Sequence, residues 1–114
     1  MTGKATNPTV VSDETLRLFL NRIAGVREEI RHLILFGSRA RGDARSDSDY
    51  DLLVVVAKRT SALLEVLYDA VMETLLVSGR LVSLKIFVGS EYERLNKLST
   101  PFMRRVREQG VPLG

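Results

Sequence analysis

Two short apolar segments on either side of a polar loop constrain most strongly how this chain can fold. Residues 33–36 are apolar and stop at Gly37, and residues 52–56 are five consecutive apolar residues rich in valine. Short apolar runs bounded by turn residues are typical of buried strands. A valine-rich run without polar alternation indicates a central strand. The sequence therefore predicts two core strands, joined by a polar connection that opens to solvent.

Two aspartates stand at the entry of the second of these strands. Asp49 and Asp51 are one residue apart, so both point to one face of the strand while Tyr50 points to the other and packs. Adjacent carboxylates raise each other's pKa unless a cation lies between them. The pair therefore predicts a divalent-metal site. Asp47 has the same parity but is better explained as a turn residue of the loop.

Composition narrows the choice of metal. The 114 residues include no cysteine and one histidine, His32. This excludes disulfides, zinc–thiolate sites, thiol catalysis and sites with several histidines. Any metal must have oxygen ligands, which favours magnesium, manganese or calcium over zinc. His32, at the start of the first strand, is expected to be structural.

Length and charge limit the class of protein. A chain of 114 residues allows one domain, 1–114, in which the small polar segment 1–11 is expected to be a flexible lead-in. No apolar run is long enough for a membrane span, and no secretory segment is evident, so we expect a cytoplasmic protein. A net charge of +3 suits binding to nucleotides or an acidic partner, and is too small to indicate a nucleic-acid-binding protein.

The remaining pattern predicts the order of the other elements. Apolar residues at helical spacing predict a first helix that is capped by Ser12. It either runs to about residue 30, weakened at Gly25, or ends at Gly25, with 26–31 as a looser turn. The expected strands are 32–36, 50–56 and 81–88; the expected helices are 61–77, 91–97 and 101–109, with a short helix or turn at 38–42. The connection between the first two strands is long for a hairpin, and such connections are usually functional.

A family resemblance rests on residues 37–55, GSRARGDARSDSDYDLLVV. A Gly-Ser turn, a gap of ten residues and an Asp-x-Asp between two strands resemble the signature of the DNA polymerase β-like nucleotidyltransferases. The fuller string is similar to the minimal nucleotidyltransferases of the MNT or MntA type, which occur beside HEPN-domain proteins in toxin–antitoxin pairs. The resemblance implies an α/β (α+β) nucleotidyltransferase fold, with a small mixed sheet and helices packed mainly on one face.

The resemblance also implies roles for four residues. In the family the Gly-Ser pair holds the nucleotide phosphates, which here are assigned to Gly37 and Ser38. The acid pair holds Mg²⁺ or Mn²⁺, which here is assigned to Asp49 and Asp51 as metal ligands and catalytic residues. Glycine lets backbone approach a phosphate closely, and the serine opens a short helix whose backbone N–H can reach a phosphate oxygen.

Three basic residues are candidates for nucleotide binding from their chemistry alone. Arg39 and Arg41 could contact a triphosphate because guanidinium groups suit phosphate geometry. The alternative for both is a solvated basic loop. Lys85, on the third strand, could bind a phosphate or replace part of a metal's charge. The arginines Arg104, Arg105 and Arg107 form either a solvated helix face or a contact for an acidic partner.

The third strand departs from the family pattern. Active relatives often supply a third carboxylate there, but LVSLKIFV holds none, and Ser83 and Lys85 occupy the corresponding face. Deprotonation of the acceptor hydroxyl then lacks its obvious base, so the sequence does not decide whether the site catalyses transfer. Glu91 and Glu93 lie beyond the Gly89 break and are not expected to substitute.

Three functions stay open. The first is a magnesium-dependent enzyme that moves AMP from ATP to a hydroxyl; the resemblance suggests a tyrosine of a cognate HEPN toxin, an acceptor supplied by a partner. The second is a nucleotide-binding antitoxin that neutralises its toxin by contact. The third, adenylylation of a small molecule, would normally need an added domain. Homo- and hetero-oligomers are both compatible with the sequence.

Overall fold

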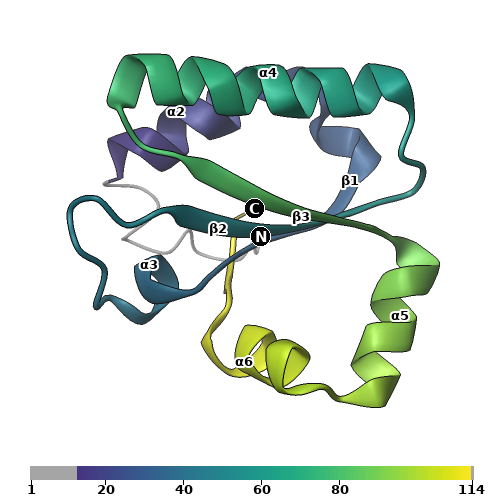
Figure 1. Ribbon diagram of the computed structural model, residues 1–114. Helices are drawn as coiled ribbons and strands as arrows, with labels where there is room; N and C mark the ends of the chain where they lie inside the picture. Colours follow the sequence, from purple (N-terminus) through teal and green to yellow (C-terminus); the bar gives the residue numbers. More distant parts are fainter. Residues whose placement is uncertain (1–12, 114) are drawn as a thin grey trace, which may run out of the picture.

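The two apolar segments form the centre of a four-stranded sheet in the computed structural model, which describes residues 13–113 (Figure 1). β1 (Ile30–Phe36) and β2 (Tyr50–Val56) pair antiparallel, and β3 (Val82–Val88) runs parallel to β2. The two-residue β4 (Val111–Pro112) pairs antiparallel with the other side of β1, so the order is β3-β2-β1-β4. The sheet is mixed, as the resemblance implies.

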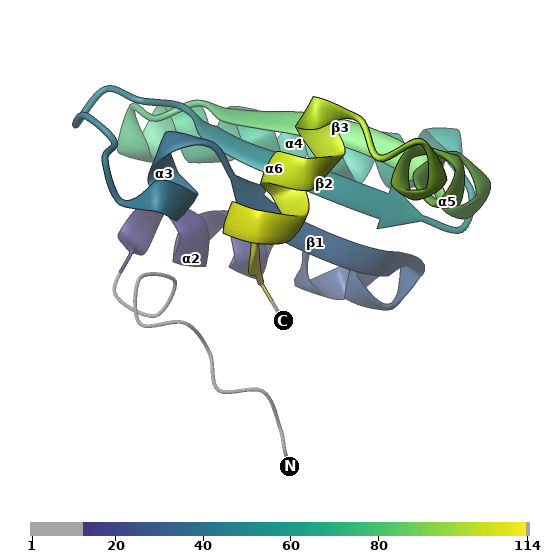
Figure 2. The same cartoon turned by 90° about the horizontal axis from the view of Figure 1, so that it is seen from below.

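Helices cover both faces of this sheet. The longest helix, α4 (Ser61–Ser78), and α2 (Glu14–Arg22) lie along one face (Figure 1). On the other face, α6 (Pro101–Gln109) crosses the strands, and α5 (Gly89–Leu98) follows the C-terminal end of β3 (Figure 2). The short α3 (Ser38–Arg41) lies beside the start of β2. Among the described residues, no helix is long and apolar enough to span a membrane.

The core lies mainly on the α2 and α4 side. Leu16 and Phe19 of α2 and Leu67 of α4 are fully buried there, against alternate residues of β1 and β2. A smaller cluster on the opposite face joins Val55 of β2 to Val106 of α6. Because helices cover both faces, residues 52–56 are at most 1% exposed, which explains why β2 reads as a continuous apolar run.

The first helix ends earlier than predicted. It begins after Asp13, whose Oδ1 accepts a hydrogen bond from the backbone N–H of Leu16 at 2.9 Å. The predicted cap, Ser12, and the predicted lead-in, 1–11, lie outside the described residues. α2 stops at Arg22, and a 3₁₀ helix, η1 (Ala24–Glu29), fills the segment that was predicted as helix to residue 30 or, after Gly25, as a looser turn. The apolar spacing continues through η1, so periodicity alone did not show the change of helix type.

The two other differences lie near the C-terminus. The Gly89-Ser90 pair begins α5 instead of separating it from β3, and Glu91 caps the helix by accepting from the Val88 N–H at 3.0 Å. The strand β4 was not predicted, because two residues carry no periodicity and Pro112 argues against a strand. It is tolerated at the sheet edge, where a missing N–H is not needed.

We expect Leu67→Ala to lower the free energy of unfolding by about 2–5 kcal/mol, because it leaves a cavity between α4 and the sheet. Leu76→Ala on the same helix should change it by less than about 0.5 kcal/mol, since Leu76 is 75% exposed. Urea denaturation followed by circular dichroism measures both. Equal losses in the two variants would contradict the assignment of the buried face.

Candidate functional site

The turn after β1 places the backbone of Gly37, which has no side chain, next to the carboxylate of Asp51. Phe36 pairs with Asp51 across β1 and β2, so Gly37 follows directly beside the start of β2. Gly37 has φ +76° and ψ −160°, a conformation that is essentially restricted to glycine. A Cβ at this position would lie 2.6 Å from Oδ2 of Asp51. The missing side chain therefore leaves a small space in front of the Asp51 carboxylate.

The two aspartates lack protein partners. Within residues 13–113, neither the Asp49 nor the Asp51 side chain takes part in a hydrogen bond or an ion pair. Burial raises the pKa of Asp51, and the charge of Asp49 raises it further, whereas Lys85 lowers it. A half-buried carboxylate with an acidic neighbour is costly without a cation. The donor set and the space at Gly37 fit a divalent metal held by oxygen ligands.

The third strand adds no acid to this pair. Ser83 pairs with Asp51, and Lys85 pairs with Leu53, so both β3 residues lie on the Asp51 face. No group of three or more histidine, aspartate and glutamate residues that could hold a metal occurs in the part of the chain that the structure describes. Two carboxylates, a serine and an exposed lysine thus define the chemistry that β2 and β3 offer here.

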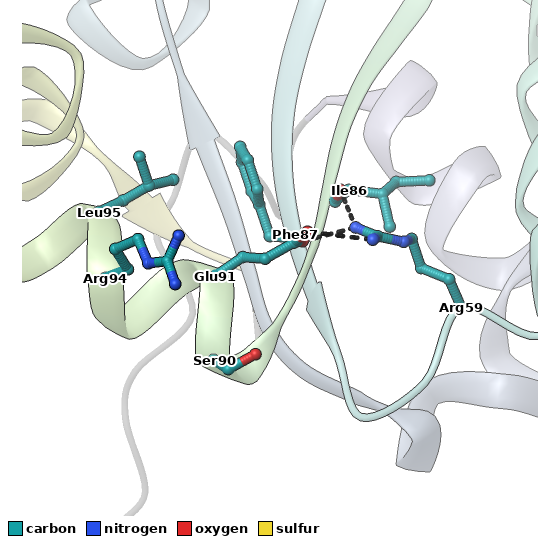
Figure 3. A pocket seen from close by; sticks show the side chains of 7 residues that line it. All are labelled: Arg59, Ile86, Phe87, Ser90, Glu91, Arg94 and Leu95. Atoms are coloured by element: carbon teal, nitrogen blue, oxygen red, sulfur yellow. Dashed lines mark hydrogen bonds and ion pairs between the residues drawn. The ribbon is translucent and has the colours of Figure 1, made fainter.

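Glu91 lies at the opposite end of β3 and is already paired. Its Oε1 and Oε2 accept from Nη1 and Nη2 of Arg59 at 2.5 and 3.1 Å. Val88, which precedes α5, pairs with Val56, five residues beyond Asp51, a separation of about 17 Å along the strand. Arg59 and Glu91 line a pocket of about 510 Å³ together with Arg94 (Figure 3). This pocket is therefore separate from the aspartate pair.

Arg39 anchors the loop that carries Asp49. Its Nε and Nη2 donate to the Ser48 carbonyl at 3.2 and 2.9 Å, and Nη2 also donates to the Ser46 carbonyl at 3.2 Å. Its Cζ lies 4.2 Å above the centre of the Tyr50 ring. Sequence reasoning missed this role, since bonds to backbone carbonyls leave no residue pattern. A contact between Arg39 and a triphosphate stays a prediction, although the guanidinium is engaged with the loop.

Tyr50 points away from the aspartate face, as strand alternation predicts. Its hydroxyl donates to Oδ2 of Asp13 at 2.7 Å, which ties the start of β2 to the start of α2. Burial raises the pKa of Tyr50, and the hydrogen bond to Asp13 raises it further, so the phenol stays protonated at neutral pH. The ring and the Arg39 guanidinium together line a small pocket behind the loop.

The other predicted nucleotide contacts lie around the same loop. Ser38 begins α3 and is half-buried, while Arg41 is exposed, with its Nε 3.3 Å from Oδ2 of Asp43. Such an exposed pair is weak and can be exchanged for a ligand. The phosphate-binding roles of Ser38 and Arg41 stay predictions.

Comparison with known proteins gives consistent results. The family model described as "Polymerase beta, Nucleotidyltransferase" matches residues 20–113. A protein of Methanocaldococcus jannaschii named "Putative protein adenylyltransferase MJ0604" is 32% identical over 99 residues, which cover 86% of this chain and 93% of that protein. A solved structure titled "Crystal structure of the toxin-antitoxin with AMP-PNP" has the same fold, with a TM-score of 0.50 at 20% identity, over 82% of this chain and 71% of that chain.

We expect Asp51→Asn to stabilise the protein at pH 7.5 in the absence of metal. The raised pKa means that ionised Asp51 costs folding free energy above that pKa, and the amide removes the cost. The gain should be about 0.5–1 kcal/mol, limited by partial exposure, and should vanish as the pH falls through the pKa of folded Asp51. Thermal unfolding from pH 7.5 to pH 4 tests this. A loss of stability at pH 7.5 would contradict an uncompensated carboxylate.

Proposed function

The chain belongs to the polymerase beta nucleotidyltransferase family, and on this basis we propose that it transfers AMP from ATP to a hydroxyl of a partner protein. The observation that carries the proposal is the pair Asp49 and Asp51, which forms no ion pair within residues 13–113 and of which Asp51 borders the space left by Gly37. An unpaired acid pair beside accessible backbone suits a metal-bound triphosphate.

The reaction exchanges one phosphoester bond for another. The acceptor oxygen attacks the α-phosphorus of ATP, a new P–O bond forms, and the bond to the bridging oxygen breaks as pyrophosphate leaves. Bound Mg²⁺ or Mn²⁺ would neutralise the charge on the phosphate oxygens. Asp49 and Asp51 would hold that ion, while Gly37 lets the phosphates approach the backbone. Exposed Lys85, on the same face as Asp51, adds a positive charge for a phosphate oxygen.

The acceptor proton has no obvious base on this chain. Ser83 occupies the β3 position beside Asp51, where a third carboxylate would otherwise take the proton. The proton then passes to solvent or to the leaving pyrophosphate. A phenol, with a pKa near 10, needs less help to ionise than an aliphatic hydroxyl. This chemistry favours a tyrosine over a serine or threonine as acceptor.

The names of two similar proteins support a protein as the acceptor. The Methanocaldococcus relative is named a protein adenylyltransferase, and the solved structure with the same fold is titled a toxin–antitoxin with AMP-PNP. The sequence resemblance to MntA-type proteins narrows the acceptor to a tyrosine of a HEPN-domain toxin, which AMP transfer would inactivate.

A second function rests on the same strand. With Ser83 and Lys85 beside Asp51, the site resembles one that binds a nucleotide without turning it over. In this alternative the chain is a nucleotide-binding antitoxin that neutralises its toxin by contact, with little or no AMP transfer.

The decisive experiment incubates the full chain with a candidate HEPN-domain protein, ATP and Mg²⁺. We expect intact mass spectrometry to detect one added AMP on the partner. Asp49→Asn and Asp51→Asn should each reduce the transfer rate at least about a hundredfold, because each removes one metal ligand. Asp43→Asn is the matched control, since Asp43 is an exposed acid of the same loop whose partner is Arg41.

The outcome separates the two functions. If ATP binds but no AMP appears on the partner with Mg²⁺ or Mn²⁺, the transfer proposal fails and the nucleotide-binding alternative holds. If the aspartate variants neutralise the toxin as well as the parent, AMP transfer is not how the toxin is inactivated.

Two glycine variants test, by binding alone, whether the space that Gly37 leaves beside Asp51 is needed for the metal–nucleotide complex. Gly37→Ala and Gly79→Ala both place a side chain at positive φ, and each should lose about 1–3 kcal/mol of stability. Only Gly37→Ala adds an atom against Asp51, because nothing lies within 4 Å of the Cβ position at Gly79. We expect Gly37→Ala alone to weaken Mn²⁺–ATP binding, by about tenfold, in calorimetry at a temperature where both variants are folded. Equal binding by the two variants would show that the space at Gly37 is not part of the binding site.

A further inference from the structure

The outer face of α4 exposes a line of large apolar side chains. Tyr68, Met72 and Leu76 are 53%, 55% and 75% exposed, and Val77 beside them is 65% exposed. Residues four apart lie on one line along a helix, so the first three form a continuous stripe. Single exposed apolar residues are ordinary in soluble proteins, but a contiguous line of them marks a contact surface.

A line of acids runs beside this stripe. Glu65, Asp69 and Glu73 are also four apart, and each lies three residues before a member of the stripe. At 100° per residue the acidic line is displaced by about 60° around the helix from the apolar line. α4 holds no lysine or arginine, although the whole protein has a net charge of +3. The acids are therefore a local feature and do not follow from the overall composition.

These acids are available to a partner. Glu73 lies 3.6 Å from Nη2 of Arg22 on α2, but both side chains are about half exposed, and such pairs contribute little. Glu65 and Asp69 form no ion pair within residues 13–113. A ligand with positive charges placed along this line would gain interactions that the protein itself does not make.

We propose that this surface, the α4 face, binds an amphipathic helix of another protein whose apolar stripe is bordered on one side by lysine or arginine. The α4 face is defined as Tyr68, Met72 and Leu76 with Glu65, Asp69 and Glu73. The apolar line contributes burial, and the acidic line selects a basic partner and sets its orientation.

Two other occupants fit the charges less well. In an antiparallel pair of two α4 helices, the same side of each apolar stripe faces its counterpart, so the acids of one copy would meet those of the other. An anionic membrane surface attracts basic segments and repels acidic ones. Neither a second α4 helix nor an anionic lipid surface supplies positive charge along the acidic line.

The α4 face lies on the opposite side of the sheet from the aspartate site. α4 covers one face of the sheet (Figure 1), while Leu53 and Val55 of β2, and by strand alternation Asp51, belong to the other. A helix bound on α4 therefore leaves Asp49 and Asp51 accessible. The proposal does not depend on nucleotidyl transfer, and its test uses binding alone.

The test uses two synthetic helical peptides with the same leucine stripe, bordered by lysine in one and by glutamate in the other. Fluorescence anisotropy with the full chain should show about tenfold tighter binding of the lysine peptide, with the difference shrinking in high salt. Met72→Ser with Leu76→Ser should abolish binding, and Asp69→Lys should reduce the preference. The matched controls are Leu98→Ser and Glu93→Lys, exposed residues of α5, which should change neither result.

Three outcomes would overturn the proposal. The first is equal or absent binding of the two peptides. The second is binding that the α4 variants and the α5 controls alter to the same extent. The third is a parent protein that sediments as a dimer and becomes a monomer on Leu76→Ser, which would assign the face to a second copy of the chain.

Discussion

The register between β1 and β2 sets Phe36 opposite Asp51, and the geometry of the site follows from it. With this pairing the chain turns at Gly37 immediately beside the carboxylate, so bare backbone and acid meet without a side chain between them. A slip by one residue would send Asp51 into the core and Tyr50 to the opposite face. The apolar alternation of both strands prevents such a slip, since it would expose the residues that bury against α2 and α4.

The loop between these strands is held from one side and open on the other. On the α2 side, Asp13 accepts from the Tyr50 hydroxyl, and Arg39 binds the Ser48 carbonyl while it covers the Tyr50 ring. On the aspartate side, Asp51 has a raised pKa and no hydrogen-bond partner in the described chain. The contacts that order the loop thus offset the cost of an uncompensated carboxylate, an arrangement expected where ligand binding outweighs stability.

The sequence predicted the elements that have long, regular patterns. The bounds of β2 and the opposite directions of Tyr50 and Asp51 agree with the structure, because the apolar run and strand alternation determine them locally. What it did not predict depends on distant contacts. The strand β4 exists only because β1 offers a free edge, and the role of Arg39 depends on carbonyl groups that any residue could supply. The phosphate-binding roles assigned from the sequence stay predictions.

The position of α4 has a consequence for how such a protein can diversify. The strand β2 lies between two core clusters, the larger one on the α2 and α4 side and the smaller one on the α6 side. Replacements on the solvent side of α4 can accumulate without changing the surroundings of Asp49 and Asp51, since α4 and the Asp51 side chain lie on opposite sides of the sheet. Proteins of this kind could therefore evolve new binding partners on the α4 side of the sheet while the residues around the aspartate pair, on the other side, stay the same.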